Sequence, residues 1–358
     1  MKNTKKSFKI GMALLFAVAS VNLAGCGKRI NPTAAALLTQ PSAAPQQIYD
    51  PAPSYNDYYP NNTLEAVAPA VPNTQSGSFK VDQSTFSSWQ AKGIAAAGGT
   101  IYLTVADTKG IMQYGTIVKM NSTDGKGWKN IGTGTLGLTH PIGKTVQGIA
   151  ISGSTLIAVD SSSKVYTLDI SNNKVKTNKA VGGIDVAAGG GSVFIANGTV
   201  AKTDTSASSS TPINGLSASG GVGADNQGNG YAVNGNTIKK VDMSGMVQDV
   251  ITSDLTAPVD VASDSRNGDI YVLEQSMIKR FNLNGQLLCS FSSGASKPVA
   301  ITVDESGCVY VADAGSSNKD SKVIKFAAST NAVMNNQAAN GYGGNSYNNS
   351  LMNNRNRY

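Results

Sequence analysis

Residues 298–304 read Pro298-Val299-Ala300-Ile301-Thr302-Val303-Asp304, and Ser306-Gly307 leads from them into Val309-Tyr310-Val311-Ala312-Asp313. Two short runs rich in β-branched and aromatic residues therefore flank a turn that contains glycine, which is typical of a β-hairpin. A third run, Val323-Ile324-Lys325-Phe326, follows shortly afterwards. The stretch predicts three short antiparallel strands in close succession.

The same succession of runs recurs along the chain. The first strands of the repeats are anchored at Ile94, Ile149, Ile184, Val222, Val259 and Val299. The first interval between anchors is 55 residues, and the later intervals are 35 to 40 residues. A period near 40 with three or four short strands is what a β-propeller blade requires, because one small sheet cannot bury both of its faces alone. We therefore expect an all-β, six-bladed β-propeller over residues 79–328.

The fifth and sixth repeats resemble NHL repeats. Each has Pro-Val with an aspartate further on, then a glycine before Ile/Val-Tyr-Val, and then a basic and aromatic third strand such as Ile278-Lys279-Arg280-Phe281. The resemblance spans roughly residues 93–328 and is weakest in the third and fourth repeats. It implies six blades arranged around a narrow channel.

The sixth repeat lacks an outer strand, because no β pattern follows Ala328. A strand-like piece, Phe79-Lys80-Val81, stands unpartnered before the first repeat and is followed by Phe86 and Trp89. An unjoined first and last blade would expose sheet edges. We therefore predict that residues 79–89 pair with residues 322–327 and close the propeller.

The N-terminus is typical of an export signal. Four lysines without an acid precede the apolar run from Ile10 to Val21, which is too short to span a bilayer. The stretch Leu23-Ala24-Gly25-Cys26 then resembles the lipobox of bacterial lipoproteins. This resemblance implies that residues 1–25 are a signal peptide, that Cys26 carries palmitate-type lipid, and that the protein is anchored in the cell envelope. Gly27 resembles the outer-membrane sorting pattern of Gram-negative hosts.

The flanking segments are of low complexity. Residues 26–78 contain the lipidated cysteine followed by a linker rich in Pro, Ala and Asn, and we expect this linker to be disordered. Residues 329–358 hold ten asparagines together with Gly, Ser and Tyr. We expect a disordered tail there, with self-association as the alternative.

Charge argues against a nucleic-acid partner. The formal net charge is +7, but residues 1–25 contribute four lysines and no acid, so the mature chain carries +3. Charged residues make up only 14% of the chain, and the body has no basic cluster. Cys289 and Cys308 lie in an exported segment, where either a disulfide or two separate thiols would be stable.

One polar residue follows the second strand of each repeat. These residues are Asp107, Asp160, Asn197, Asn234, Glu274 and Asp313. In a propeller they would form a ring on one face, which would serve as a cation or polar-ligand site. The alternative, which we favour, is that each side chain caps the following turn by accepting backbone N–H hydrogen bonds.

Two further features concern the channel and the loops. Asp185 and Asp260 occupy equivalent places in the innermost strands of repeats 3 and 5, which indicates a polar channel or a contact with a neighbouring blade. His140, the sole histidine, lies in the long stretch Gly132 to Lys144. One histidine excludes sites that need a histidine pair, and a solvated loop position is expected for it.

The favoured function is a membrane-anchored, non-catalytic binding or scaffold platform without a cofactor. Its expected partner is another envelope protein, a peptide or a glycan. The first alternative is a calcium-dependent hydrolase resembling the sugar lactonases, which would need only Glu, Asn and Asp around the ion. The second alternative is a structural adhesin. Because propellers host both binders and enzymes, the fold itself does not choose among them.

Overall fold

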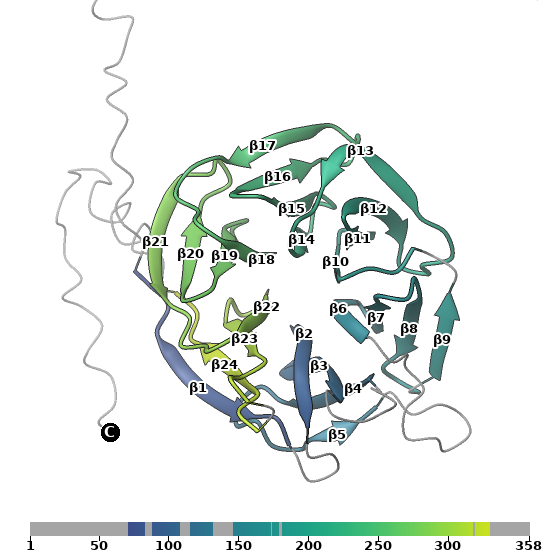
Figure 1. Ribbon diagram of the computed structural model, residues 1–358, viewed down its shortest axis with the longest axis vertical. Helices are drawn as coiled ribbons and strands as arrows, with labels where there is room; N and C mark the ends of the chain where they lie inside the picture. Colours follow the sequence, from purple (N-terminus) through teal and green to yellow (C-terminus); the bar gives the residue numbers. More distant parts are fainter. Residues whose placement is uncertain are drawn as a thin grey trace, which may run out of the picture. The chain divides into compact units, whose positions relative to one another are not determined.

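The computed structural model describes residues 71–82, 88–107, 115–131, 146–172, 174–178, 181–317 and 319–329. Within these ranges the chain forms six four-stranded antiparallel sheets and no helix. Figure 1 shows the sheets arranged as blades around a central axis. The expected all-β, six-bladed β-propeller is therefore confirmed.

Each blade begins at the centre and adds strands outward. The innermost strands contact one another around the axis and are β2 (Trp89–Ala97), β6 (Val146–Ser152), β10 (Asp185–Gly189), β14 (Val222–Ala224), β18 (Pro258–Ser263) and β22 (Pro298–Val303). The second strands are β3 (Thr100–Asp107), β7 (Thr155–Asp160), β11 (Ser192–Asn197), β15 (Gly230–Asn234), β19 (Ile270–Glu274) and β23 (Val309–Asp313).

The third and fourth strands complete the blades on the outside. The third strands are β4 (Gly115–Asn121), β8 (Val165–Asp169), β12 (Thr199–Asp204), β16 (Thr237–Val241), β20 (Met277–Phe281) and β24 (Lys322–Phe326). The fourth strands are β5 (Lys129–Asn130), β9 (Lys174–Asn178), β13 (Thr211–Ser217), β17 (Val247–Ile251), β21 (Leu287–Ser292) and, in the sixth blade, β1 (Gln75–Lys80).

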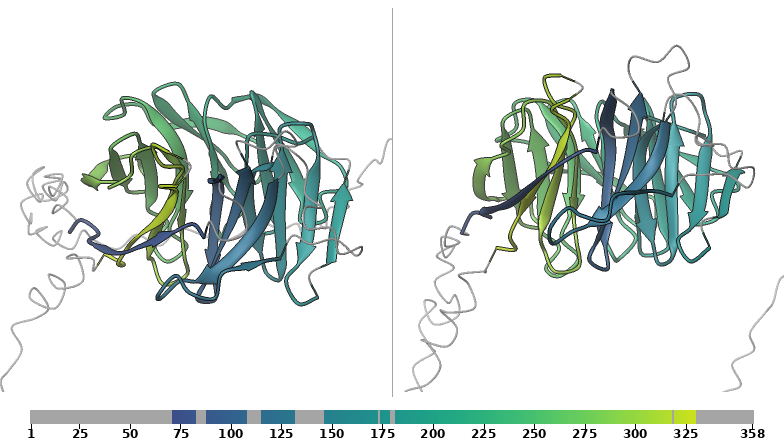
Figure 2. Two further views of the ribbon diagram at one scale, coloured as in Figure 1. Left: turned by 60° about the horizontal axis from the view of Figure 1, so that its bottom comes forward. Right: turned by 90° about the horizontal axis from the view of Figure 1, so that it is seen from below.

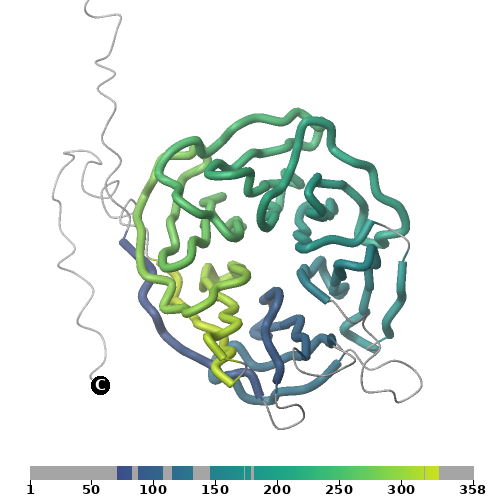
Figure 3. Tube along the Cα trace, in the orientation of Figure 1, coloured from purple at the N-terminus to yellow at the C-terminus, as the bar shows by residue number. Residues whose placement is uncertain are grey.

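The sixth blade takes its outer strand from the other end of the domain. β1 pairs antiparallel with β24, with Phe79 opposite Val323 and Lys80 opposite Lys322. Figures 1 and 3 show β1 lying along β24, so that the first and last strands of the propeller are neighbours. Closure by pairing with the last strand is confirmed, and it supplies hydrogen-bond partners to an otherwise open sheet edge.

The predicted bounds of the closing segment were wrong in part. The strand begins at Gln75 and ends at Lys80, so it lies earlier than residues 79–89. Trp89 instead starts β2, the innermost strand of the first blade, opposite Asp107. Phe86 lies outside the described residues. Residues 75–80 include alternating serine and glycine and lack the apolar pattern that predicts a strand. The start of the strand was therefore not predicted.

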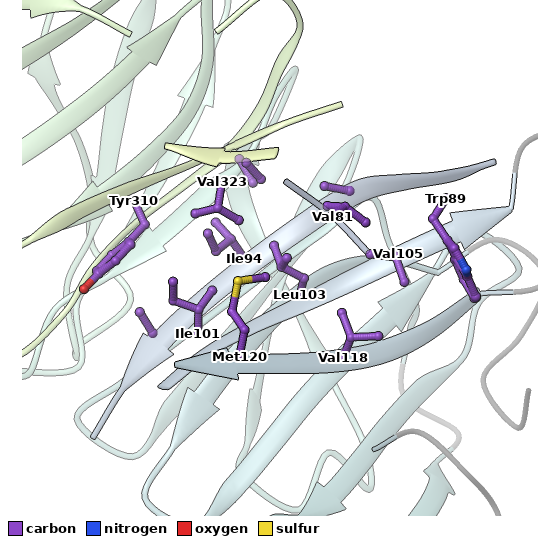
Figure 4. Close-up of a cluster of buried hydrophobic side chains, with 14 residues drawn as sticks. Val81, Trp89, Ile94, Ile101, Leu103, Val105, Val118, Met120, Tyr310 and Val323 are labelled. Carbon is purple, nitrogen blue, oxygen red and sulfur yellow. The ribbon is translucent and has the colours of Figure 1, made fainter. Parts of the chain in front are cut away.

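The hydrophobic core lies between neighbouring blades. Figure 4 shows the cluster at the seam between the first and sixth blades, where Trp89, Leu103 and Met120 meet Tyr310 and Val323. All of these side chains are at most 3% exposed. Burying a large apolar side chain stabilises the fold by roughly 1.5–3 kcal/mol. The seam is therefore held by side-chain packing as well as by the β1–β24 hydrogen bonds.

The two faces of the disc differ in the turns they carry. The strands run between these faces, as the side views in Figure 2 show. On one face the innermost strand of each blade turns into the second strand, for example between Val303 and Val309 or between Ser263 and Ile270. We call this the hairpin face. The second strands end on the opposite face.

Both ends of the described domain lie at the hairpin face. Gln75 pairs with Phe326, and Phe326 pairs with Val309 at the hairpin end of its blade. The Ser329 Oγ donates to the Val71 carbonyl at 2.7 Å and accepts a hydrogen bond from buried Arg280 at 2.6 Å. The first and last described residues, Val71 and Ser329, therefore lie next to each other. Among the described residues there is no helix of the length and hydrophobicity that crossing a membrane requires.

Candidate functional site

The six polar residues after the second strands do lie at one face, and three of them are buried acids bonded to turns. Asp160 accepts hydrogen bonds from the N–H groups of Ser162 and Lys164, both at 2.9 Å. Asp313 accepts from Lys297 N at 2.8 Å and from Gly315 N at 2.9 Å. These are the contacts of turn-capping carboxylates.

Glu274 also engages the backbone. Its Oε1 accepts from Thr256 N at 2.6 Å, and its Oε2 lies 3.0 Å from Lys279 Nζ. Asp107 accepts a hydrogen bond from the Ser88 hydroxyl. Asn234 donates to the Ser217 Oγ at 2.7 Å. Asn197 is exposed at the end of β11.

The residues present do not fit a calcium site at this ring. A hard cation needs several carboxylate or carbonyl oxygens converging on one point, whereas these oxygens point at separate turns in separate blades. Among the described residues no group of three or more His, Cys, Asp or Glu side chains is arranged to hold a metal ion. Asp160, Glu274 and Asp313 therefore act as separate local caps of backbone N–H groups.

Asp185 and Asp260, in contrast, are brought together in the channel. Asp185 lies on β10 and accepts a hydrogen bond at 2.8 Å from the N–H of Val222 in the next blade. Asp260 lies on β18 and accepts from Ile301 N at 2.8 Å, again in the next blade. The two carboxyl groups are also hydrogen-bonded to each other. These hydrogen bonds link β10, β14, β18 and β22, the innermost strands of blades three to six, which follow one another around the axis in Figure 1.

Two glycines make room for this pair. A Cβ on Gly221 would lie 1.9 Å from Asp260 Oδ1 and 2.8 Å from Asp185 Oδ2. A Cβ on Gly148 would lie 2.4 Å from Asp185 Oδ1. The carboxyl groups therefore occupy space that a side chain on the neighbouring innermost strands would otherwise fill.

Burial raises the pKa values of Asp185 and Asp260 and so favours a protonated carboxyl group in the pair. Desolvation raises the pKa of Asp185 to about 6, although hydrogen bonds from Val222, Val186 and Asp260 oppose the shift. Desolvation, assisted by the nearby charge of Asp185, raises the pKa of Asp260 well above its ordinary value. A carboxylate has no proton to donate, so the mutual hydrogen bond requires that one of the two groups be protonated.

The pair lies at one end of a cavity of about 340 Å³ on the axis. The walls come from all six innermost strands; many of their residues are small or aliphatic, such as Ala95, Ala150 and Ala187, but polar atoms form more of the exposed lining than apolar atoms do. The other end is rimmed by residues of the hairpin turns, among them Gly153, Gly190, Asn226 and Ser265. The cavity therefore runs from the two aspartates to the hairpin face.

The hairpin turns carry a motif that the sequence analysis did not single out. Asp304 Oδ1 accepts from the N–H groups of Ser306 and Cys308, both at 2.9 Å, and its Oδ2 accepts from the Tyr310 hydroxyl at 2.8 Å. Asp225 and Tyr231 repeat this arrangement in the fourth blade. An aspartate six residues before a tyrosine is the signal that could have revealed these turns.

The remaining predicted positions are isolated from the pair. Cys289 lies on β21 and Cys308 lies before β23, and both are free thiols. The disulfide alternative is therefore not formed in this structure. Burial raises the pKa of Cys289. His140 falls outside the described residues.

Comparisons with known proteins bear on the fold. No protein-family model matches the chain, and comparison with curated proteins gives no match. A calcium-binding protein, regucalcin, from Agrobacterium tumefaciens strain C58 aligns with a TM-score of 0.52 and 10% identity, covering 72% of this chain and 95% of that chain. A Bacteroides thetaiotaomicron protein of unknown function gives 0.50 and 13%, covering 73% and 74%. A gluconolactonase from Xanthomonas campestris gives 0.49 and 11%, covering 73% and 99%. At these identities the first two likenesses, with TM-scores of 0.52 and 0.50, show a shared fold and nothing finer.

Proposed function

We propose that the protein is a lipid-anchored, non-catalytic binding platform of the cell envelope that receives its partner at the hairpin face of an NHL-like propeller. The observation that carries this proposal is the axial cavity of about 340 Å³, which reaches that face. Pockets that hold ligands are typically concave, mostly apolar and supplied with a few convergent polar groups. The cavity is concave and the two aspartates are its convergent polar groups, while polar atoms form more of its exposed lining than in a typical apolar pocket.

The anchor follows from the lipobox. Lipid on Cys26 would tether the propeller through residues 27–70, which reach at most about 150 Å when fully extended. Two or three acyl chains hold a protein on a membrane stably. In a Gram-negative host, Gly27 favours the outer membrane. The partner is an envelope protein, a peptide or a glycan.

A calcium-dependent lactonase is the alternative, and the two carboxyl groups in the channel are the observation that favours it. Three of their four oxygens already accept backbone hydrogen bonds, from Val222, Val261 and Ile301. Ca²⁺ takes about 6–8 oxygen ligands, whereas the two carboxyl groups together supply at most four. The pair therefore favours binding over metal-assisted hydrolysis. The adhesin hypothesis concerns residues 329–358 and stays a prediction.

Lipid labelling tests the anchor. Cells expressing the full chain with an alkyne-palmitate label should yield a labelled band, and Cys26→Ser should remove the label, because a hydroxyl does not replace the thiol nucleophile. Cys289→Ser is the matched control and should keep the label. Labelling of the Cys26→Ser variant would contradict the lipoprotein proposal.

Site-specific photo-crosslinking tests the platform in the native envelope. A photoreactive phenylalanine at Asn226 or Ser265, on the cavity rim, should give a defined adduct under ultraviolet light. The same residue at Asn197, on the opposite face, is the control and should not. Adducts from Asn197 alone, or from neither face, would contradict the proposal. Calcium-dependent lactone hydrolysis that Asp260→Asn abolishes would establish the alternative.

A further inference from the structure

The acidic pair in the axial cavity has no basic side chain beside it among the described lining residues. Asp185 and Asp260 both line the cavity, and Asp260 is only 4% exposed. The described residues that line this cavity include no lysine, arginine or histidine. A carboxyl pair that shares one proton keeps one negative charge. The N–H groups of Val222, Val261 and Ile301 donate to the pair but carry no positive charge, so they do not neutralise it.

A polar group on the same wall, the Ser263 hydroxyl, has no hydrogen-bond partner among the described residues. Among the described residues, the Ser263 Oγ is the buried side-chain atom without a hydrogen bond. Ser263 lines the cavity on β18, three residues from Asp260 toward the hairpin face. Buried polar atoms are normally hydrogen-bonded, so an unpartnered one beside a cavity points to a partner that occupies the cavity.

The walls between these groups are narrow. They are built from innermost-strand residues such as Ala150, Ala187 and Ile301, whose side chains are largely buried between the blades, so that polar atoms form more than half of the exposed lining. A cavity of about 340 Å³ lies at the lower end of the range for ligand pockets, roughly 300–1,000 Å³. The occupant is therefore small or is one extended side chain, with a short aliphatic stem and a charged or donor-bearing tip.

We propose that the axial cavity binds an organic ammonium group, with Asp185 and Asp260 accepting its hydrogen bonds and its short alkyl chain lying along the cavity. Charge-assisted hydrogen bonds between an ammonium and a carboxylate are among the strongest polar contacts in proteins. The same chemistry is offered by a free alkylamine and by a lysine side chain of a partner peptide. This inference rests on the proposed function and names the chemical group that the platform receives.

The test uses the full mature chain in detergent micelles, with methyl NMR of Ile149 and Ile301 as cavity reporters. Titration with n-pentylamine should shift these methyl signals with a dissociation constant at least about tenfold lower than for 1-pentanol, its neutral isostere. Asp185→Asn and Asp260→Asn should each remove most of this preference. Asp169→Asn, in an exposed turn of the second blade, is the matched control and should keep it.

Two further measurements distinguish the two sources of the ammonium group and show which of the two proposals has failed. Tripeptides with a central lysine or norleucine distinguish a partner's lysine side chain from a free amine. If the platform receives a peptide, the lysine tripeptide should bind most tightly. Equal affinity for pentylamine and pentanol, or unchanged binding in both aspartate variants, would overturn the inference. So would Ca²⁺ shifting the reporters while the amine does not. If the rim crosslinks persist in any of these cases, the platform stands and only the ammonium assignment fails.

Discussion

Aspartates in the outer turns and aspartates in the channel have opposite acid–base properties in this propeller. Hydrogen bonds from Ser171, Ser206 and Ser244 lower the pKa values of Asp169, Asp204 and Asp242, all of which sit in exposed turns. Burial raises the pKa values of Asp185 and Asp260. Position relative to solvent and to backbone N–H donors therefore decides whether an aspartate stabilises a turn or holds a proton.

This difference in pKa indicates which aspartates can bind a ligand. The carboxylate oxygens of a turn aspartate accept hydrogen bonds from donors in the same turn. Replacing that aspartate therefore lowers the stability of the fold. Asp185 and Asp260 accept hydrogen bonds from neighbouring blades, but they also share a proton and carry a charge beside a cavity. Substitutions in the two sets should therefore have different signatures.

The largest effect is expected for Asp304→Ala in a hairpin turn. The change leaves the Tyr310 hydroxyl and the N–H groups of Ser306 and Cys308 without their acceptor. We expect a loss of about 2–4 kcal/mol in the free energy of unfolding, measured by urea denaturation. Asp304→Asn keeps an acceptor and should lose less. A cost below about 0.5 kcal/mol would show that the turn caps contribute little.

A smaller loss is expected for Gly221→Ala, which places a methyl group against the channel pair. The Cβ would approach Asp260 Oδ1 to 1.9 Å, so one of the two must move. We expect a loss of about 1–3 kcal/mol. In the Asp260→Ser background the same alanine should cost less, giving a coupling of at least about 0.5 kcal/mol in a double-mutant cycle. Strict additivity would contradict the close packing of the pair.

Asp185→Asn should stabilise the protein at neutral pH. A folded-state pKa near 6 lies above the unfolded value of about 3.9, so the folded state binds the extra proton and wild-type stability falls as pH rises from 4 through 6. Asparagine keeps an oxygen acceptor for Val222 N and needs no proton. We expect a gain of about 1–2 kcal/mol at pH 7.5 that shrinks toward pH 4, measured by urea unfolding. An equal effect at both pH values would contradict the assignment.

The smallest effect is expected for Asn197→Ala. Its side chain is exposed at the end of β11, and exposed substitutions away from special features usually change stability by less than about 0.5 kcal/mol. Thermal unfolding should therefore be nearly unchanged. A large loss would mean that all six strand-end positions act as caps of similar strength.

The sequence predicted the blades because each repeat carries its own strand and turn pattern. Ile149, Val222 and Val299 lie in the innermost strands β6, β14 and β22. Ile184 differs, because β10 begins one residue after it. The closing strand was placed too late, because Gly77 and Ser78 lack a β pattern of their own and the strand is set by its partner β24. Local propensity does not report such long-range pairing.

The candidate site was predictable only in part. Asp185 and Asp260 stood out as acids in otherwise apolar strands, but their contact depends on a glycine in the intervening blade, Gly221. The distance between residues 75 positions apart follows from the curvature of the whole ring and not from any local pattern. Asp304 and Tyr310 were overlooked although their six-residue spacing recurs at Asp225 and Tyr231.

The most direct test of the account is a carboxyl ¹³C NMR titration of the mature chain from pH 3 to pH 9. We predict that the Asp185–Asp260 pair releases a proton near or above pH 6, whereas Asp169, Asp204 and Asp242 titrate below the ordinary aspartate value. Titration of both channel aspartates near pH 4, together with the turn aspartates, would contradict the claim that the channel holds a distinct, proton-sharing acidic site.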